Sequence, residues 1–141
     1  MVIRLRLTLA AAAGMCLVAT AAAAASWRGV PGAPDVEIDL ASVQVEQTRV
    51  IAWVRWWGRH PLAPELARLG PQAPRVHRTA LRTEFDCARR TVRVLGTNAY
   101  DSGGTATFMS SVPGQPQPVN GQEMGWAYDA MCEAARSERR L

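Results

Sequence analysis

The sequence predicts an α+β domain, with a single antiparallel β-sheet of about five to six strands, a C-terminal α-helix packed on one face, and a disulfide linking the two. Residues 36–57 and 77–112 alternate apolar and polar side chains between turn residues, which is typical of antiparallel strands. A helical pattern follows from Glu123 to about Arg136, and its apolar side needs a sheet to cover. One cysteine, Cys87, falls in a strand segment and another, Cys132, in that helix.

The first 25 residues have the pattern of a secretory signal peptide. Two arginines precede an uncharged stretch, residues 7–25, that ends in alanines and is followed by Ser26. Cleavage after Ala25 leaves one domain of 116 residues, 26–141. The alternatives are an uncleaved signal anchor and a lipid anchor. We expect neither, because the stretch is rich in alanine and Cys16 lies inside it rather than at its end.

Export and charge limit the function classes. The formal charge falls from +4 to +2 on cleavage, because Arg4 and Arg6 are removed, so no electrostatic argument favours nucleic acid. No second long apolar stretch follows, so we expect no membrane span after cleavage. We therefore expect the domain in the periplasm or at the cell surface, where an oxidising environment lets two cysteines form a disulfide.

The first two strand segments are the clearest in the chain. Residues 36–40 place Val, Ile and Leu on one face, with Glu37 and Asp39 on the other, and a kink is expected near residues 41–42 before Val43 and Val45. Residues 48–57 predict a longer strand with two distinct faces. We expect the smoother apolar face to meet the core, namely Val50, Ala52, Val54 and Trp56. We expect the other face to be partly solvated, namely Arg49, Ile51, Trp53, Arg55 and Trp57.

The Gly58–Arg75 segment contains four prolines and predicts a long loop, which is either a binding surface or a tolerated insertion. Beyond it, residues 77–87 predict a strand with Leu81, Thr83, Phe85 and Cys87 on one face. Residues 91–95 and 105–112 predict two further strands, separated by a turn at 100–104. A linker at 113–118 leads to the helix, where Asn120 and Glu123 fit a capping box and residues 127, 130 or 131, and 134 form the apolar stripe.

A structural disulfide between Cys87 and Cys132 is the clearest chemical feature of the sequence. Redox pairs are usually close in sequence, and these two are not. The histidines, His60 and His77, lack metal-ligand spacing, so we expect no metal and no cofactor. Ser102 has no nearby base, and we interpret Glu84 and Asp86 as partners in solvated ion pairs, so we expect no catalytic residue and no enzyme.

Three tryptophans stand within five residues. Because side chains alternate along a strand, Trp53 and Trp57 share one face and Trp56 takes the other. Aromatic residues beside arginine are typical of protein contacts, so the candidate protein-binding residues are Trp53, Arg55 and Trp57. Two interpretations remain open: either these side chains are exposed, or the 58–75 loop or a second copy of the chain covers them.

The sequence resembles the surface-adhesin protein E family of small exported bacterial proteins. The matching segments, in order, are Trp27, residues 38–43, 50–54 and 84–87, residues 89–93, residues 100–101, and Cys132. They span nearly all of the exported chain, and their order and spacing are more specific than any one of them. The resemblance implies a single sheet with a C-terminal helix and a disulfide between Cys87 and Cys132. The family's lysine-rich surfaces have no counterpart in a chain whose sixteen basic residues are all arginine, so the resemblance assigns no ligand-binding residue.

These observations predict an exported, non-enzymatic protein-binding module, related by its resemblance to adhesins that contact host matrix and plasma proteins. Its partner would be a protein of the extracellular matrix or of the cell envelope, and a homo-oligomer is a further expectation. A second hypothesis is a soluble periplasmic structural or regulatory protein, in which the same aromatic residues form an interface inside the envelope. A third is an enzyme whose site the sequence does not reveal.

Overall fold

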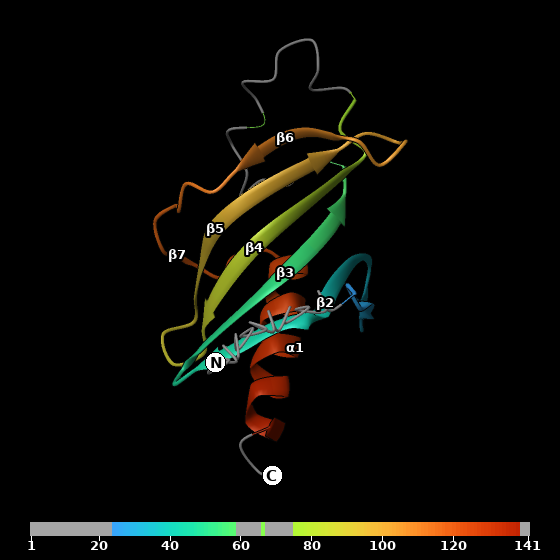
Figure 1. The fold of residues 1–141 in the computed structure, drawn as a ribbon. Coiled ribbons are helices and arrows are strands. Elements are labelled where there is room, and N and C mark those ends of the chain that lie inside the picture. Colours follow the sequence, from blue (N-terminus) through green and yellow to red (C-terminus); the bar gives the residue numbers. More distant parts are fainter. Residues whose placement is uncertain (1–23, 59–65, 67–74, 139–141) are drawn as a thin grey trace, which may run out of the picture.

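The strands follow one another as an antiparallel meander. The computed structural model describes residues 24–58, 66 and 75–138. Six strands lie side by side in chain order, and the short β7 pairs with the same edge of β5 as β6 does (Figure 1). Their bounds are β1 (Trp27–Val30), β2 (Ala33–Glu46), β3 (Arg49–Trp57), β4 (Arg78–Asp86), β5 (Thr91–Tyr100), β6 (Ala106–Ser110) and β7 (Gln117–Pro118), and the helix α1 spans Gln122–Glu138.

This architecture confirms the predicted antiparallel sheet with a C-terminal helix. Two strands were not expected from the sequence. β1 has four residues and no alternating pattern, and β7 is a two-residue pairing inside the proline-containing linker. β5 continues to Tyr100, beyond the predicted end at residue 95, because a register shift opposite Arg82 and Thr83 lets pairing with β4 resume.

The core lies between α1 and one face of the sheet. The predicted face of β3 is confirmed, since its four inward side chains are at most 3% exposed. From α1, the buried residues recur at helical spacing: Met124, Ala127, Tyr128, Met131, Cys132 and Ala135. Ala135 is therefore buried where the sequence predicted Ala134, which is half-buried. Phe85 packs edge-on against Tyr128, with ring centroids 6.2 Å apart.

The predicted kink in β2 is confirmed as a β-bulge. The pairing with β3 shifts register between Asp39 and Gln44. Ser42 holds the bulge, because its hydroxyl donates to the Asp39 carbonyl at 2.7 Å and accepts the Trp53 N–H at 2.9 Å. Leu40 does not join the core face as the alternation predicted. It is 41% exposed, since the strand leaves regular pairing at that point.

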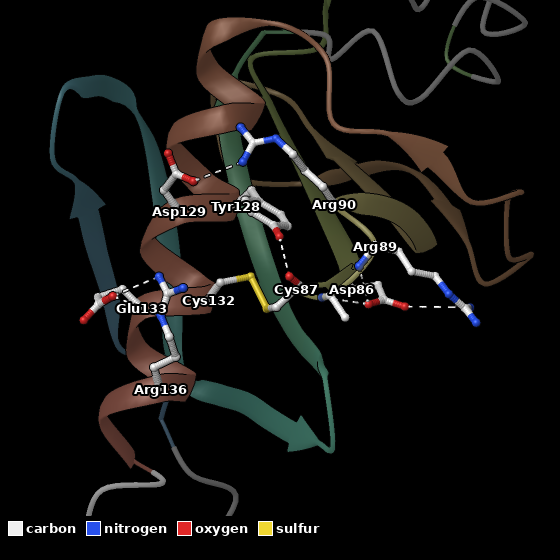
Figure 2. Close-up of a disulfide and its surroundings, with 10 residues drawn as sticks. Asp86, Cys87, Arg89, Arg90, Tyr128, Asp129, Cys132, Glu133 and Arg136 are labelled. Carbon is white, nitrogen blue, oxygen red and sulfur yellow. Dashed lines mark hydrogen bonds and ion pairs between the residues drawn. A yellow bond between two sulfur atoms is a disulfide. The ribbon is translucent and has the colours of Figure 1, made fainter.

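The predicted disulfide is confirmed, and it fastens the helix to the sheet. Cys87, directly after β4, is bonded to Cys132 in α1, with Cα atoms 5.7 Å apart (Figure 2). Beside it, the Tyr128 hydroxyl donates to the Cys87 carbonyl at 2.9 Å. The helix is thus attached to the β4–β5 turn at Cys87 by a covalent bond and a hydrogen bond, and Arg90 of that turn adds an ion pair to Asp129 at 3.8 Å (Figure 2).

Several sequence predictions fall outside the described residues. They include nearly all of the signal peptide, His60, and most of the Gly58–Arg75 loop. Leu66 is described within that loop; it is 1% exposed and belongs to the core. The predicted capping box depends on the side chain of Glu123, which is not described.

Candidate functional site

The side chains that alternate away from α1 form the second face of the sheet, here called the distal face. At its centre is a depression of about 360 Å³, here called the distal depression. Ala80 lies at its middle because it pairs with Arg55 on one side and Asn98 on the other. The residues that line it are Trp27, Asp39, Trp53, Arg55, Arg78, Ala80, Asn98, Tyr100 and Gly104.

Residues of β1 and β2 hold the side chain of Arg55, which lies on β3. Its guanidinium carbon lies 4.2 Å from the centroid of the Trp27 ring, and its Nε donates to Glu37 Oε2 at 2.5 Å. The stacked ring and the carboxylate together restrict the rotamers of Arg55. The positive charge of Arg55 is therefore matched by Glu37, and the indole of Trp27 is held at the rim of the depression.

Asp39 ties β1 to the sheet at the same rim. Its side chain lies on the distal face, and the residue is only 8% exposed. The carboxylate Oδ1 accepts the backbone N–H of Ser26 at 2.7 Å and of Ala41 at 3.1 Å. Because Trp27 follows Ser26 directly, this acceptor holds the backbone from which the Trp27 ring extends.

We expect Asp39→Ala to lower the free energy of unfolding by about 2 kcal/mol, because two hydrogen bonds to a charged acceptor are lost in a buried place. The measurement is urea denaturation followed by circular dichroism. Asp35→Ala is the matched control, since Asp35 lies on the same strand and is exposed. Equal stabilities of the two variants would show that Asp39 does not anchor β1.

The three predicted binding residues occupy different places on the distal face. Trp53 and Arg55 are half-buried and line the depression. Trp57 lies outside the lining and is 48% exposed. Its ring packs edge-on against His77 at 5.1 Å and lies 5.5 Å from the guanidinium carbon of Arg78. Trp56 points into the core, as alternation predicted.

Sequence patterns did not single out four other lining residues as site residues: Trp27, Arg78, Asn98 and Tyr100. A signal for Arg78 was present. The alternation that places Arg82 and Glu84 on the outer face of β4 continues back through Ala80 to Arg78. The others depend on strand pairing, which brings Asn98 opposite Ala80 and Tyr100 opposite Arg78.

A second hollow of about 310 Å³ adjoins the distal depression, and the two share Trp53 and Asn98. It extends to the edge strand β6, where Met109 is 69% exposed. Trp53 thus stands between two hollows that together run across the sheet from β1 to β6. A surface of this form suits an extended segment better than a compact ligand.

The acidic residues Glu84 and Asp86 contact arginine side chains and backbone N–H groups. Glu84 lies within 3.1 Å of an Arg93 nitrogen and 3.6 Å of an Arg49 nitrogen, and Asp86 accepts the backbone N–H groups of the following turn. Across residues 24–58, 66 and 75–138, no group of three or more His, Cys, Asp or Glu side chains could hold a metal ion. In the same part of the chain, no helix is both long and apolar enough to cross a membrane.

Comparison with known proteins shows a likeness in fold. No protein-family model matches the chain, and no curated protein matches it in sequence. The fold is similar to that of Haemophilus influenzae protein E. The match covers 79% of this chain and 86% of protein E, with a TM-score of 0.52 and 14% sequence identity. At that identity the likeness to protein E concerns the fold, and it agrees with the fold that the family resemblance implied.

Proposed function

We propose that this chain is an exported, non-enzymatic binding module of the protein E type, and that its distal face contacts a protein partner. One observation carries the proposal. Three of the five tryptophans, Trp27, Trp53 and Trp57, lie on the distal face with Arg55, although α1 covers the opposite face of the sheet. Tryptophan and arginine are the residues most enriched at the centres of protein interfaces.

Two further findings support the proposal. The Cys87–Cys132 disulfide suits an extracellular or periplasmic compartment, where disulfides persist. The fold likeness to protein E, together with the resemblance to the surface-adhesin protein E family, favours adhesion to host or extracellular proteins. The alternative is that the partner is a protein of the bacterial envelope and that this chain stays in the periplasm. The two alternatives predict different cellular locations for this chain, and the trypsin experiment below distinguishes them.

Binding is tested with the protein purified after export from the full-length chain. It is passed over immobilised extracellular-matrix, plasma and envelope proteins, and retention is measured by biolayer interferometry. We expect at least one of the immobilised proteins to bind. Trp57→Ser should weaken that binding about tenfold, which is typical of an interface residue that contributes moderately to the binding free energy. Asp129→Ala on the exposed side of α1 is the matched control and should bind as the wild type does. Undiminished binding by Trp57→Ser and Trp53→Ser, with both variants folded, would contradict the proposal.

Location is tested with trypsin on intact and permeabilised cells, followed by immunodetection. Trypsin suits this chain because it cleaves at arginine, and lysine-directed labels do not, because the chain has no lysine. We expect the protein to be degraded on intact cells if it meets host proteins. Degradation only after permeabilisation would contradict the adhesin assignment and favour an envelope partner.

A further inference from the structure

Arg78 is the unusual charge of the distal face. It is half-buried at the edge of the distal depression, and its Nε is buried without a hydrogen-bond partner. In the described ranges, the Arg78 side chain makes no hydrogen bond and no ion pair, and its guanidinium carbon lies 5.5 Å from the centroid of the Trp57 ring. A buried guanidinium N–H without an acceptor destabilises a fold, so its retention points to an acceptor outside the chain.

The other half-buried arginines of this face have a carboxylate partner, including Arg93, whose Nε is likewise buried without a hydrogen-bond partner. Arg55 is paired with Glu37, and both Arg49 and Arg93 are paired with Glu84. Arg82, on the same strand as Arg78, is exposed, so water solvates its charge. Within the part of the distal face that the structure describes, Arg78 is therefore the half-buried arginine that lacks a carboxylate.

The neighbours of Arg78 complete an anion-binding arrangement. Tyr100 lies directly opposite it in the β4–β5 pairing. The Tyr100 hydroxyl accepts Asn98 Nδ2 at 3.3 Å, which leaves its own proton free to be donated to a ligand. Trp27 and Trp53 line the same depression and provide apolar surface beside these donors.

We propose that the distal depression binds the carboxylate of an aspartate or glutamate on an extended segment of the partner protein, with Arg78 as the counter-ion and Tyr100 as a second donor. This inference rests on the proposed function. A single guanidinium and a neutral hydroxyl suit a monoanion. Asp39 also lines the depression, and its negative charge disfavours a dianion such as phosphate. The hollow on either side of Trp53 accommodates the residues that flank the carboxylate.

The test uses an array of terminally blocked hexapeptides, each with one glutamate and each matched by its glutamine counterpart. We expect wild-type protein to bind its best glutamate peptides about tenfold more tightly than their glutamine counterparts, as a charge-assisted pair predicts. Arg78→Gln should remove that preference while its Tm stays at or above that of the wild type. Arg82→Gln, the matched control on the same strand, should keep the preference. In the wild type, the Nε–H resonance of Arg78 should shift on titration with a glutamate peptide and stay in place with the glutamine peptide.

Each other result overturns the inference. Equal binding of glutamate and glutamine peptides, or a preference that survives Arg78→Gln, excludes Arg78 as a carboxylate receptor. Competition by inorganic phosphate more strongly than by acetate would assign the depression to a different anion. If partner proteins bind through Trp53 and Trp57 while the peptides show no glutamate preference, the proposed function stands and the carboxylate assignment fails. If neither proteins nor peptides bind, both fail.

Discussion

Replacing Cys87 and Cys132 together by alanine is expected to lower the free energy of unfolding by about 4 kcal/mol. The bond closes a loop with a sequence separation of 45 residues, and in the chain-entropy model a loop of that length stabilises by about this amount. Cys132 is also 2% exposed, so loss of its sulfur leaves a small gap against β4. Because small domains unfold with only about 5–15 kcal/mol, the variant should approach its unfolding midpoint near physiological temperature.

The measurement is urea denaturation of the double variant beside oxidised and reduced wild type. Reduced wild type is the matched control, because it lacks the bond but keeps both side chains. We expect the reduced protein and the variant to have similar midpoints, both well below that of the oxidised protein. A variant within 1 kcal/mol of oxidised wild type would mean that the packing of α1, rather than the disulfide, holds the helix on the sheet.

Phe85→Ala is expected to destabilise the domain by about 4 kcal/mol, which is typical of a buried phenylalanine replaced by alanine. Phe85 is fully buried, and it faces Tyr128 of α1 edge-on. Loss of the Phe85 ring opens a cavity where the sheet, the helix and the disulfide meet. The Cys87–Cys132 disulfide limits how far α1 can move to fill that cavity.

Thermal denaturation measures this change, with Met109→Ala as the control. Met109 is 69% exposed on the edge strand, so its truncation should change the stability by less than about 0.5 kcal/mol. A Phe85→Ala variant as stable as Met109→Ala would show that the core does not lie between α1 and β4.

The fold was predictable where local patterns decide it. Alternation in β3 separates Val54 and Trp56 from Trp53 and Arg55, and the structure places these pairs on opposite faces. The disulfide was predictable from export and from the number of cysteines left. β1 was not predictable as a strand, because four residues carry no usable period and their pairing depends on the Asp39 side chain.

The candidate site was predictable only in part. Trp53 and Arg55 could be placed on the outer face from their own strand. Trp27, Asn98 and Tyr100 could not, because the register of β1 with β2, and of β5 with β4, brings them to the same depression. The lack of a counter-ion for Arg78 is likewise a three-dimensional property, since Glu84 lies only six residues away in sequence yet is paired with Arg49 and Arg93.

The central claim is that the distal face, and not the helix, meets the partner. In-cell photo-crosslinking tests it most directly, with a benzophenone amino acid replacing either Trp57 on the distal face or Asp129 on α1. Both positions are exposed, so neither replacement should prevent folding. We predict a discrete higher-mass adduct from position 57 and none from position 129. An adduct from position 129 alone, or equal adducts from both positions, would contradict the account.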